Sequence, residues 1–383
     1  ERLKEREKRG KKKFSKQITI SSKIIFLSKE RKAPPVLSNL DPILDDEGFY
    51  GVKLAIEDNL TTGRFVGHDY KAEFHRVLMK ENLIEEYQKL INSGNTIFVV
   101  DLNEKEIQSL YDNSSSKDVI IFNVRSKSDS LRNDKCRNNL FHIPPSYSML
   151  SDALTQYLVK KKWNKWFLVA GPDSNDKEYA DALKKSAKKF NIKIKKEKIW
   201  DFTADLRRTA GKEVPIFTKG EKYDVLVVAD EKGEFGEYLS YRTWDPRPIV
   251  GTQGLKPTSW HRTHEQWGAT QMQNRFRRES GRWMTEVDYH AWTAVRSIGE
   301  AITRTNSNDI SKIKEYLFGE KFGLGAYKGV KVSFRSWNGQ LRQPILLAAP
   351  RSMVSVSPQE GYIHPVSELD TMGKDQPEST CKF

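Results

Sequence analysis

Short runs of β-branched and aromatic residues alternate with helical stretches along most of this chain, and this alternation limits its fold more than any other feature. Residues 96–100 and 224–229 are apolar runs with the length of strands buried on both faces. Residues 176–190 instead place apolar side chains three and four positions apart, as an amphipathic helix does. Strands that alternate with helices predict βαβ units around parallel sheets.

This alternation occurs twice. The first half extends from an expected strand at 23–27 to another at 119–122, and the second half extends from a helix at 149–161 to a strand at 248–250. A mainly helical segment and a β-rich region follow. At 383 residues the chain exceeds what a single hydrophobic core usually supports. We therefore predict an α/β protein with two Rossmann-like lobes, each built on a parallel sheet.

The formal net charge of +14 raises the question of a nucleic-acid partner. Nine Lys or Arg residues and three Glu residues lie in the first sixteen positions, which reads as a solvated basic arm over residues 1–17. The other cations are mostly lysines spread over helix faces among acidic residues. Because the sequence has no nucleic-acid-binding motif, we expect no nucleic-acid partner. It also contains no apolar run long enough for a transmembrane helix.

Two cysteines, Cys136 and Cys381, are too few for a disulfide scaffold and lack the spacing of a metal or redox site. A bond between them would hold the polar C-terminal tail and would fit an oxidising compartment. Two unrelated free thiols are the alternative.

The sequence carries no catalytic motif of a nucleotide-binding loop, a serine hydrolase or a zinc protease. His261 and His264 have the spacing of one helical face, but a zinc site would need further ligands. We expect them instead to pack against Trp260 and Trp267. A non-enzymatic binding protein is therefore favoured over an α/β enzyme that acts on a small polar metabolite. A sensory module with the same fold but no ligand is a third alternative.

Polar residues cluster where the predicted strands end, and in open α/β sheets ligands bind beyond these carboxyl ends. In a two-lobed protein such edges face each other across a cleft. The residues that we predict to contact a ligand are Asp41, Asp46, Tyr50, Asp101, Asn123, Arg125, Asp173, Asp230, Glu231 and Gln253. Their carboxylates suggest a cationic ligand or a bound metal. For the acids at 41–47, capping of a helix that begins near Asp45 or Asp46 is an alternative.

Several segments resemble type I periplasmic binding proteins of the branched-chain amino-acid receptor group. Residues 47–59 (EGFYGVKLAIEDN) resemble their first helix, and residues 149–171 are similar to the opening of their second lobe. Residues 248–254 (PIVGTQG) resemble their second crossover, and residues 289–302 resemble the long helix that returns to the first lobe.

The resemblance is stronger to a subfamily of ABC-transporter substrate-binding proteins associated with PQQ-dependent alcohol oxidation. Four segments carry it: 34–42 (PPVLSNLDP), 223–230 (YDVLVVAD), 339–347 (GQLRQPILL) and 354–361 (VSVSPQEG). It extends from about residue 23 to the end of the chain.

This resemblance implies two lobes joined by a hinge of several crossovers. It assigns 18–143 and 253–340 to the first lobe, 144–252 to the second, and 341–383 to a C-terminal crossover and tail. It also implies a periplasmic, monomeric receptor without a cofactor, which delivers a small-molecule or metal ligand to an ABC permease and its ATPase. An oxidising compartment favours the Cys136–Cys381 bond.

The resemblance leaves the ligand open. Branched-chain receptors commonly hold the amino-acid α-groups with a loop rich in Ser and Thr beyond a first-lobe strand, whereas here that strand ends at Val100-Asp101-Leu102-Asn103. The subfamily suggests PQQ, a metal or its chelate, or an alcohol-derived solute. Carboxylates suit a hard cation such as a lanthanide, whereas polyanionic PQQ would need cations such as Arg125.

Overall fold

The computed structural model describes residues 16–33, 42–112, 118–201 and 206–383. Asp41 and most of the predicted basic arm lie outside these ranges.

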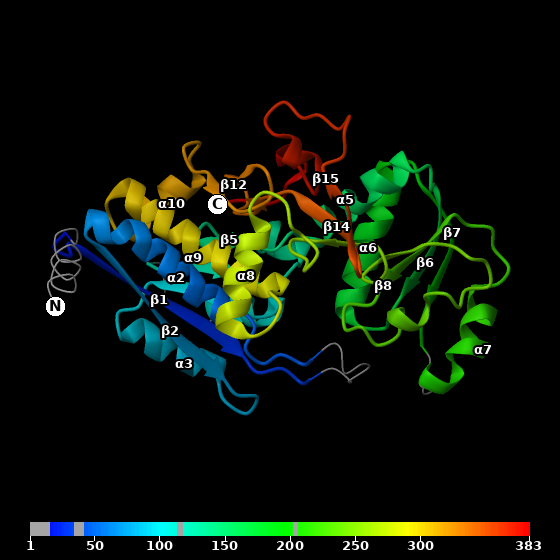
Figure 1. Ribbon diagram of the computed structural model, residues 1–383, viewed down its shortest axis with the longest axis horizontal. Coiled ribbons are helices and arrows are strands. Elements are labelled where there is room, and N and C mark those ends of the chain that lie inside the picture. Colours follow the sequence, from blue (N-terminus) through cyan, green and yellow to red (C-terminus); the bar gives the residue numbers. More distant parts are fainter. Residues whose placement is uncertain (1–15, 34–41, 113–117, 202–205) are drawn as a thin grey trace, which may run out of the picture.

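The first lobe is built on five parallel strands in the spatial order β2-β1-β3-β4-β5 (Figure 1). These strands are β1 (Ile20–Lys29), β2 (His68–Val77), β3 (Ile97–Asp101), β4 (Ile120–Asn123) and β5 (Leu140–His142). In β1, Ile24 and Phe26 belong to the apolar core on one face of the sheet, whereas Ile25 and Leu27 belong to the core on the other face. Because successive side chains of a strand point to opposite faces, such a continuous apolar run needs cover on both sides.

Helices provide this cover. The core on one face includes α2 (Phe49–Val66), α8 (Ala269–Ser280), α9 (Glu286–Thr305) and α10 (Ile310–Phe318), and the core on the other includes α3 (Leu83–Asn92) and α4 (Glu104–Asp112). The helices α2 and α9 approach each other closely at Gly51, where a Cβ atom would lie 2.1 Å from the carbonyl oxygen of Asp288. Since α8 to α10 follow the second lobe in sequence, the chain returns to complete the first lobe (Figure 1).

The second lobe has four parallel strands in the order β7-β6-β8-β9. They are β6 (Lys165–Ala170), β7 (Lys193–Ile199), β8 (Val225–Ala229) and β9 (Ile249–Gly251). The helices α5 (Tyr147–Lys160) and α6 (Ser174–Lys189) pack on the face of Trp166 and Leu168, and α7 (Leu206–Thr218) packs on the face of Phe167 and Val169. The two parallel sheets confirm the predicted α/β fold class.

Three connections join the lobes: β5 to α5, β10 (Lys256–Thr258) to α8, and β13 (Leu341–Arg342) to β14 (Ile345–Ala349). The strands β10, β14 and β15 (Ser352–Ser357) form a small antiparallel sheet that packs on α5. Another small sheet, β11 (Leu324–Gly325), β12 (Lys331–Phe334) and β13, contributes to the core of the first lobe. Short 3-10 turns occur at Asp129–Arg132 (η1), Gly236–Tyr238 (η2), Glu368–Thr371 (η3) and Gln376–Glu378 (η4).

Two helices differ from what we expected. The helix α2 begins at Phe49, whereas we expected it to begin near Asp45 or Asp46. We also did not predict α7, which lies in the stretch before β8. Its buried residues Leu206, Ala210 and Val214 recur every four positions, but the charged residues between them and Pro215 hide the pattern.

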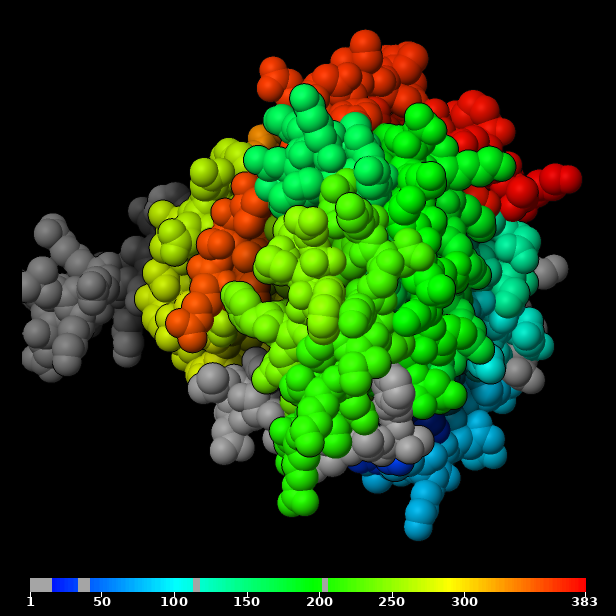
Figure 2. Space-filling view, turned by 90° about the vertical axis from the view of Figure 1, so that its right-hand side faces the viewer, coloured from blue at the N-terminus to red at the C-terminus, as the bar shows by residue number. Residues whose placement is uncertain are grey.

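Figure 2 views the molecule from the end of the second lobe, whose residues (green) cover most of this face. The C-terminal residues (red) lie along its upper edge. No helix in the described part of the chain is long and apolar enough to cross a bilayer.

Candidate functional site

Arg125, which follows β4, holds the predicted ligand residue Asp101 in an ion pair. Its Nε contacts Asp101, and its Nη2 lies 2.6 Å from a Glu47 carboxylate oxygen. Arg31 approaches Asp101 to 2.8 Å. Burial raises the pKa of Asp101, but the charges of Arg125 and Arg31 outweigh burial, and the net effect lowers this pKa. Two guanidinium groups therefore face two carboxylates, and the group is electrically balanced without a ligand.

Asp46 and Tyr50 lie at the start of α2, beside Arg282. The guanidinium of Arg282 donates to Asp46 (3.0 Å) and to Asp288 of α9 (2.7 Å), and it lies 6.0 Å from the ring centre of Tyr50. The residue at the N-cap of α2 is Gly48, and its first turn holds no acid. The capping interpretation was therefore wrong for these acids. Asp46 forms an ion pair that joins α2 to the start of α9.

Asn123 is fully buried at the end of β4. Its Oδ1 accepts hydrogen bonds from the backbone N–H groups of Arg125 (3.1 Å) and Ser126 (2.8 Å), and its Nδ2 donates to the Ser126 carbonyl (2.8 Å). These bonds fix the backbone of the loop that follows β4.

The predicted residues of the second lobe mostly hold their own loops. The carboxylate of Asp230 is buried and accepts hydrogen bonds from the backbone N–H groups of residues 234–236, at 3.0, 2.9 and 2.7 Å. Gln253 donates to the Asp230 carbonyl (3.0 Å), and Asp173 pairs with Lys232 (2.9 Å). A carboxylate surrounded by N–H donors is stabilised as an anion without a metal ion.

Glu231 reaches from the second lobe to the first, where it meets Lys127 in the loop after β4. The Lys127 Nζ lies 3.6 Å from Glu231 and 3.9 Å from Glu286 at the start of α9, and the Lys256 Nζ also lies 3.9 Å from Glu286. We call Lys127, Glu231, Lys256 and Glu286 the interlobe cluster. The side chains of Lys127, Glu231 and Glu286 are only 16–19% exposed.

The charges of the interlobe cluster depend on one another. Burial lowers the pKa of Lys127, but Glu231 and Glu286 outweigh burial, and the net effect raises it. For Glu286 the direction is reversed: burial raises its pKa, and Lys127 and Lys256 together bring it well below its usual value. Ions removed from water are stable when such partners stay in place. The cluster thus couples the position of one lobe to the other through ionised groups.

Two tyrosines of the second lobe lie close to the interlobe cluster. The rings of Tyr147 and Tyr179 stack with centres 5.5 Å apart. Burial, followed by the charge of Glu231, raises the pKa of both, and Glu286 contributes for Tyr179. The Tyr179 hydroxyl is buried and has no hydrogen-bond partner among the described residues. A buried hydroxyl without a partner is costly, so this atom suits a polar group of a bound molecule or a water.

A second contact between the lobes involves serines after β4. Ser128 donates to Glu178 of α6 (3.3 Å), and Ser130 donates to Glu104 of α4, which also receives Lys135 (3.1 Å). Burial and the nearby Glu104 raise the pKa of Glu178 to about 7. The loop after β4 thus places a serine hydroxyl at the contact between the lobes.

Sequence reasoning found Glu231 but missed Lys127, Glu286 and both tyrosines. Lys127 is two positions after Arg125, so it lies just beyond the strand end at which we expected ligand contacts. Glu286 opens α9, whose start was marked by the capping box of Thr285 and Asp288.

The comparisons with known proteins agree with this arrangement. The periplasmic binding protein family profile matches residues 81–205. Among solved structures, an ABC transporter substrate-binding protein from Sphaerobacter thermophilus has a TM-score of 0.73 at 13% identity, over 88% of this chain and 98% of that one. This chain has the type I periplasmic binding protein fold. A sequence comparison with curated proteins found no match.

Two further proteins with this fold are named for a ligand class. A branched-chain amino acid ABC transporter periplasmic ligand-binding protein from Burkholderia xenovorans has a TM-score of 0.70 at 14% identity, over 88% of this chain and 95% of that one. The branched-chain amino acid transporter substrate-binding protein of Streptococcus pneumoniae, in complex with isoleucine, has a TM-score of 0.62 at 16% identity, over 89% and 99%. Both names describe the binding of a ligand or substrate for a transporter.

In this periplasmic binding protein fold, Cys136 and Cys381 form a disulfide, as predicted, across a sequence separation of 245 residues. The packing expected for the histidines is confirmed for His264, whereas His261 accepts a hydrogen bond from the Thr263 backbone N–H (3.2 Å). His264 packs against the rings of Trp260 and Trp267, with ring centres 5.2 and 5.8 Å away, and its Nε2 lies 2.6 Å from a backbone carbonyl.

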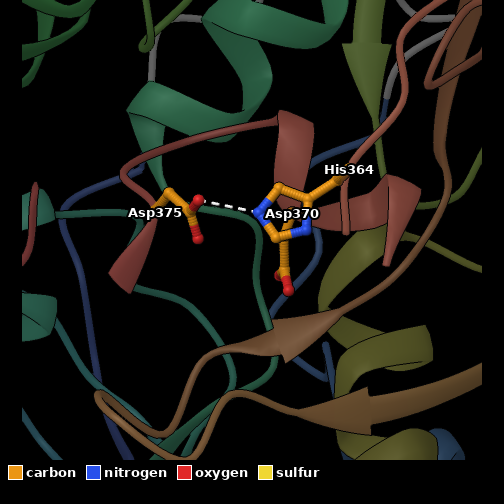
Figure 3. Close-up of side chains that lie close together, drawn as sticks. All are labelled: His364, Asp370 and Asp375. Atoms are coloured by element: carbon orange, nitrogen blue, oxygen red, sulfur yellow. Dashed lines mark hydrogen bonds and ion pairs between the residues drawn. The ribbon is translucent and has the colours of Figure 1, made fainter. Parts of the chain in front are cut away.

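His364, Asp370 and Asp375 lie close together near the C-terminus (Figure 3). The His364 Nδ1 accepts backbone N–H groups of residues 366–367, so its Nε2 carries the proton and donates to Asp375 (2.7 Å). Asp370 is engaged by the Nε of Arg335 (2.8 Å). His364 and Asp375 are thus bonded to each other and Asp370 is bonded to arginine, so each of the three side chains has a partner without a metal ion.

Proposed function

We propose that this protein is an extracytoplasmic solute-binding receptor that delivers a small ligand to an ABC permease and its ATPase, without catalysing a reaction. The fold supports this role, because its two lobes meet through ionised side chains. The observation that carries the proposal is the buried Tyr179 hydroxyl, which lacks a partner among the described residues beside the interlobe cluster. A ligand between the lobes would satisfy this group and replace the contact between Lys127 and Glu231.

The chemistry of the interlobe cluster favours a polar organic ligand with ionised groups. Lys127 suits a carboxylate, Glu231 suits an amino group, and the hydroxyls of Tyr147 and Tyr179 add hydrogen-bonding groups. The isoleucine complex of the Streptococcus pneumoniae protein makes amino acids the first class to test. The serines after β4 add hydroxyls of the kind that amino-acid receptors use.

A metal ligand has less support, because the predicted acids already have partners. Asp101 is paired with arginines, Asp230 with backbone N–H groups, and Asp173 with Lys232. The association with PQQ-dependent alcohol oxidation rests on the sequence resemblance. As a carboxylate-rich molecule, PQQ would compete for Lys127 and Arg125, so we include it among the candidates. We expect the receptor to act as a periplasmic monomer.

A thermal-shift screen of amino acids, PQQ, lanthanide ions and short alcohols or acids tests this function. A ligand at 100 times its dissociation constant stabilises a protein by about 2.7 kcal/mol, which gives a measurable shift. We expect one organic class to raise the melting temperature. Stabilisation by none of these compounds would contradict the proposal, and stabilisation by lanthanides alone would favour the metal alternative.

Lys127→Met and Lys184→Met provide a matched pair for the ligand found in the screen. Lys127 is in the interlobe cluster, whereas Lys184 pairs with Glu197 on the surface and is 40% exposed. We expect Lys127→Met to lose most of the ligand-induced shift and Lys184→Met to retain it. Equal shifts in both folded variants would place the ligand elsewhere.

A further inference from the structure

The C-terminal segment, residues 357–383, begins on the second lobe. The Gln359 backbone N–H donates to the Gln156 side chain of α5 (2.9 Å). Further along, the Gly373 backbone N–H donates to the Asp152 carboxylate of the same helix (2.8 Å). Apolar side chains of this segment also belong to the core that α5 and α6 share. These contacts hold the segment to the second lobe as far as Gly373.

The middle of the segment is bound to arginines next to the connection between β13 and β14. The Asp370 carboxylate has no exposed surface and receives the Nε atoms of Arg335 (2.8 Å) and Arg342 (2.9 Å). Arg335 also donates to the Met372 carbonyl (2.7 Å). Arg342 lies in β13, which contributes to the core of the first lobe. The segment is thus attached beside a connection about which the lobes would turn.

The end of the segment is fastened to the first lobe. Cys381 is bonded to Cys136, between η1 and β5, and the ring of Phe383 lies 5.8 Å from that of Phe318 in α10. Figure 1 shows the segment (red) leaving β15 and the C-terminus lying near β12 of the first lobe. The protein therefore has a fourth link between its lobes, and this link is closed by a covalent bond.

The free length of this link is short. Gly373 is bonded to Asp152 of the second lobe (2.8 Å), and Cys381 follows it eight residues further along the chain. Eight residues span at most about 28 Å when fully extended, and the turn η4 shortens this path. A short link between two bodies restricts how far they can rotate or separate.

We propose that residues 357–383 form a strap that restrains the relative motion of the two lobes, and that the Cys136–Cys381 bond fastens it. This inference rests on the proposed function, because it concerns the lobe motion that accompanies ligand capture. With the strap fastened, the ligand-free protein samples a narrow range of lobe arrangements. With the bond broken, the end of the strap leaves the first lobe and the range widens.

Distances between spin labels on the two lobes test the strap without any ligand. Exposed Lys89 of α3 and Lys212 of α7 are replaced by cysteine and labelled with a maleimide spin label, whose thioether bond survives reducing agents. The distance distribution is measured by pulsed electron resonance before and after reduction of the disulfide. Circular dichroism confirms that the reduced protein remains folded. The double variant C136S/C381S gives a second measurement without reductant.

We expect the distribution to broaden on reduction and in the double variant. A matched label pair within the first lobe, at Lys89 and exposed Lys312 of α10, should keep its width. Unchanged width between the lobes in the reduced, folded protein would overturn the inference. So would equal broadening of both pairs, which would indicate loosening of the first lobe itself. Since no ligand is used, a failed strap and a failed ligand screen are separate outcomes.

Discussion

Asp370 has no exposed side-chain surface and accepts hydrogen bonds from both Arg335 and Arg342. Arg335 is itself only 1% exposed. Replacing Asp370 by Asn would leave two arginines without their carboxylate, and removal of one partner from a buried ion pair costs about 3–5 kcal/mol. We expect Asp370→Asn to lower the free energy of unfolding, measured in urea, by an amount in this range.

The surface pair of Lys23 and Glu73 is the control for this prediction. Its side chains are 43% and 44% exposed, and exposed pairs contribute about 0–1 kcal/mol. Glu73→Gln should therefore have little effect. If Asp370→Asn and Glu73→Gln lower the free energy of unfolding by similar amounts, burial does not determine what these ion pairs contribute to stability.

The sequence identified which polar residues end the strands, but it did not identify what they contact. Asp230 and Asn123 were singled out correctly as polar groups at strand ends, and both are buried in hydrogen bonds to their own loops. Lys127 was overlooked because one lysine in a lysine-rich chain carries no local signal. Its distinguishing feature is the pair of carboxylates around it, from residues more than 100 positions away.

Among the elements, the helices α2 and α9 pack closely against each other, and Gly51 permits this contact. A Cβ atom at Gly51 would lie 2.1 Å from a backbone oxygen of α9, which cannot move without the helix. We expect Gly51→Ala to destabilise the protein by about 1–3 kcal/mol, the usual cost of overpacking. The measurement is the midpoint of urea unfolding at constant slope.

Gly211 in α7 provides the matched control, since it is also a helical glycine. A Cβ atom there would meet nothing within 4 Å, and the residue is exposed. Gly211→Ala should stabilise the protein by about 0.5–1 kcal/mol through helix propensity alone. A loss of stability in Gly211→Ala, or none in Gly51→Ala, would contradict the packing argument.

A helix or strand could be predicted from the sequence when its pattern of apolar and polar residues was distinct. The strands β3 and β8 are buried at every position, and their continuous apolar runs were found within one residue. In α7 only one stripe is buried, among two arginines, a lysine, a glutamate and a proline, so its period was not recognised. The start of α2 was misplaced because the acids before Gly48 resemble a capped first turn, while tertiary ion pairs hold them.

At the scale of the whole molecule, contact between the lobes should depend on pH through Glu178. Burial and Glu104 raise its pKa to about 7, from a usual value of 4.5. The folded protein therefore favours the protonated carboxyl group. The stability that Glu178 contributes is fully present below about pH 4.5 and is lost as the pH rises through about 7. We expect Glu178→Gln, which mimics the neutral form, to gain melting temperature relative to the native protein as the pH rises from 5 to 8.

Replacing the exposed Glu320 by Gln is the control, because it removes the same charge far from the lobe interface. Its melting temperature relative to the native protein should change little over this range of pH. If the difference in melting temperature between Glu178→Gln and the native protein is constant from pH 5 to 8, the Glu178 carboxyl group does not titrate in this range. That result would contradict the predicted dependence on pH.

The sequence by itself determined two parallel sheets, the cover of helices on both faces, and the absence of a catalytic motif. These features depend on the spacing of apolar residues within stretches of about ten to twenty positions, which is visible in the local sequence. The tertiary structure decided which charges meet: Lys127 with Glu231 and Glu286, and Asp370 with two arginines. The energy of a charge depends on its burial and on its neighbours. Both are fixed only when distant segments pack together.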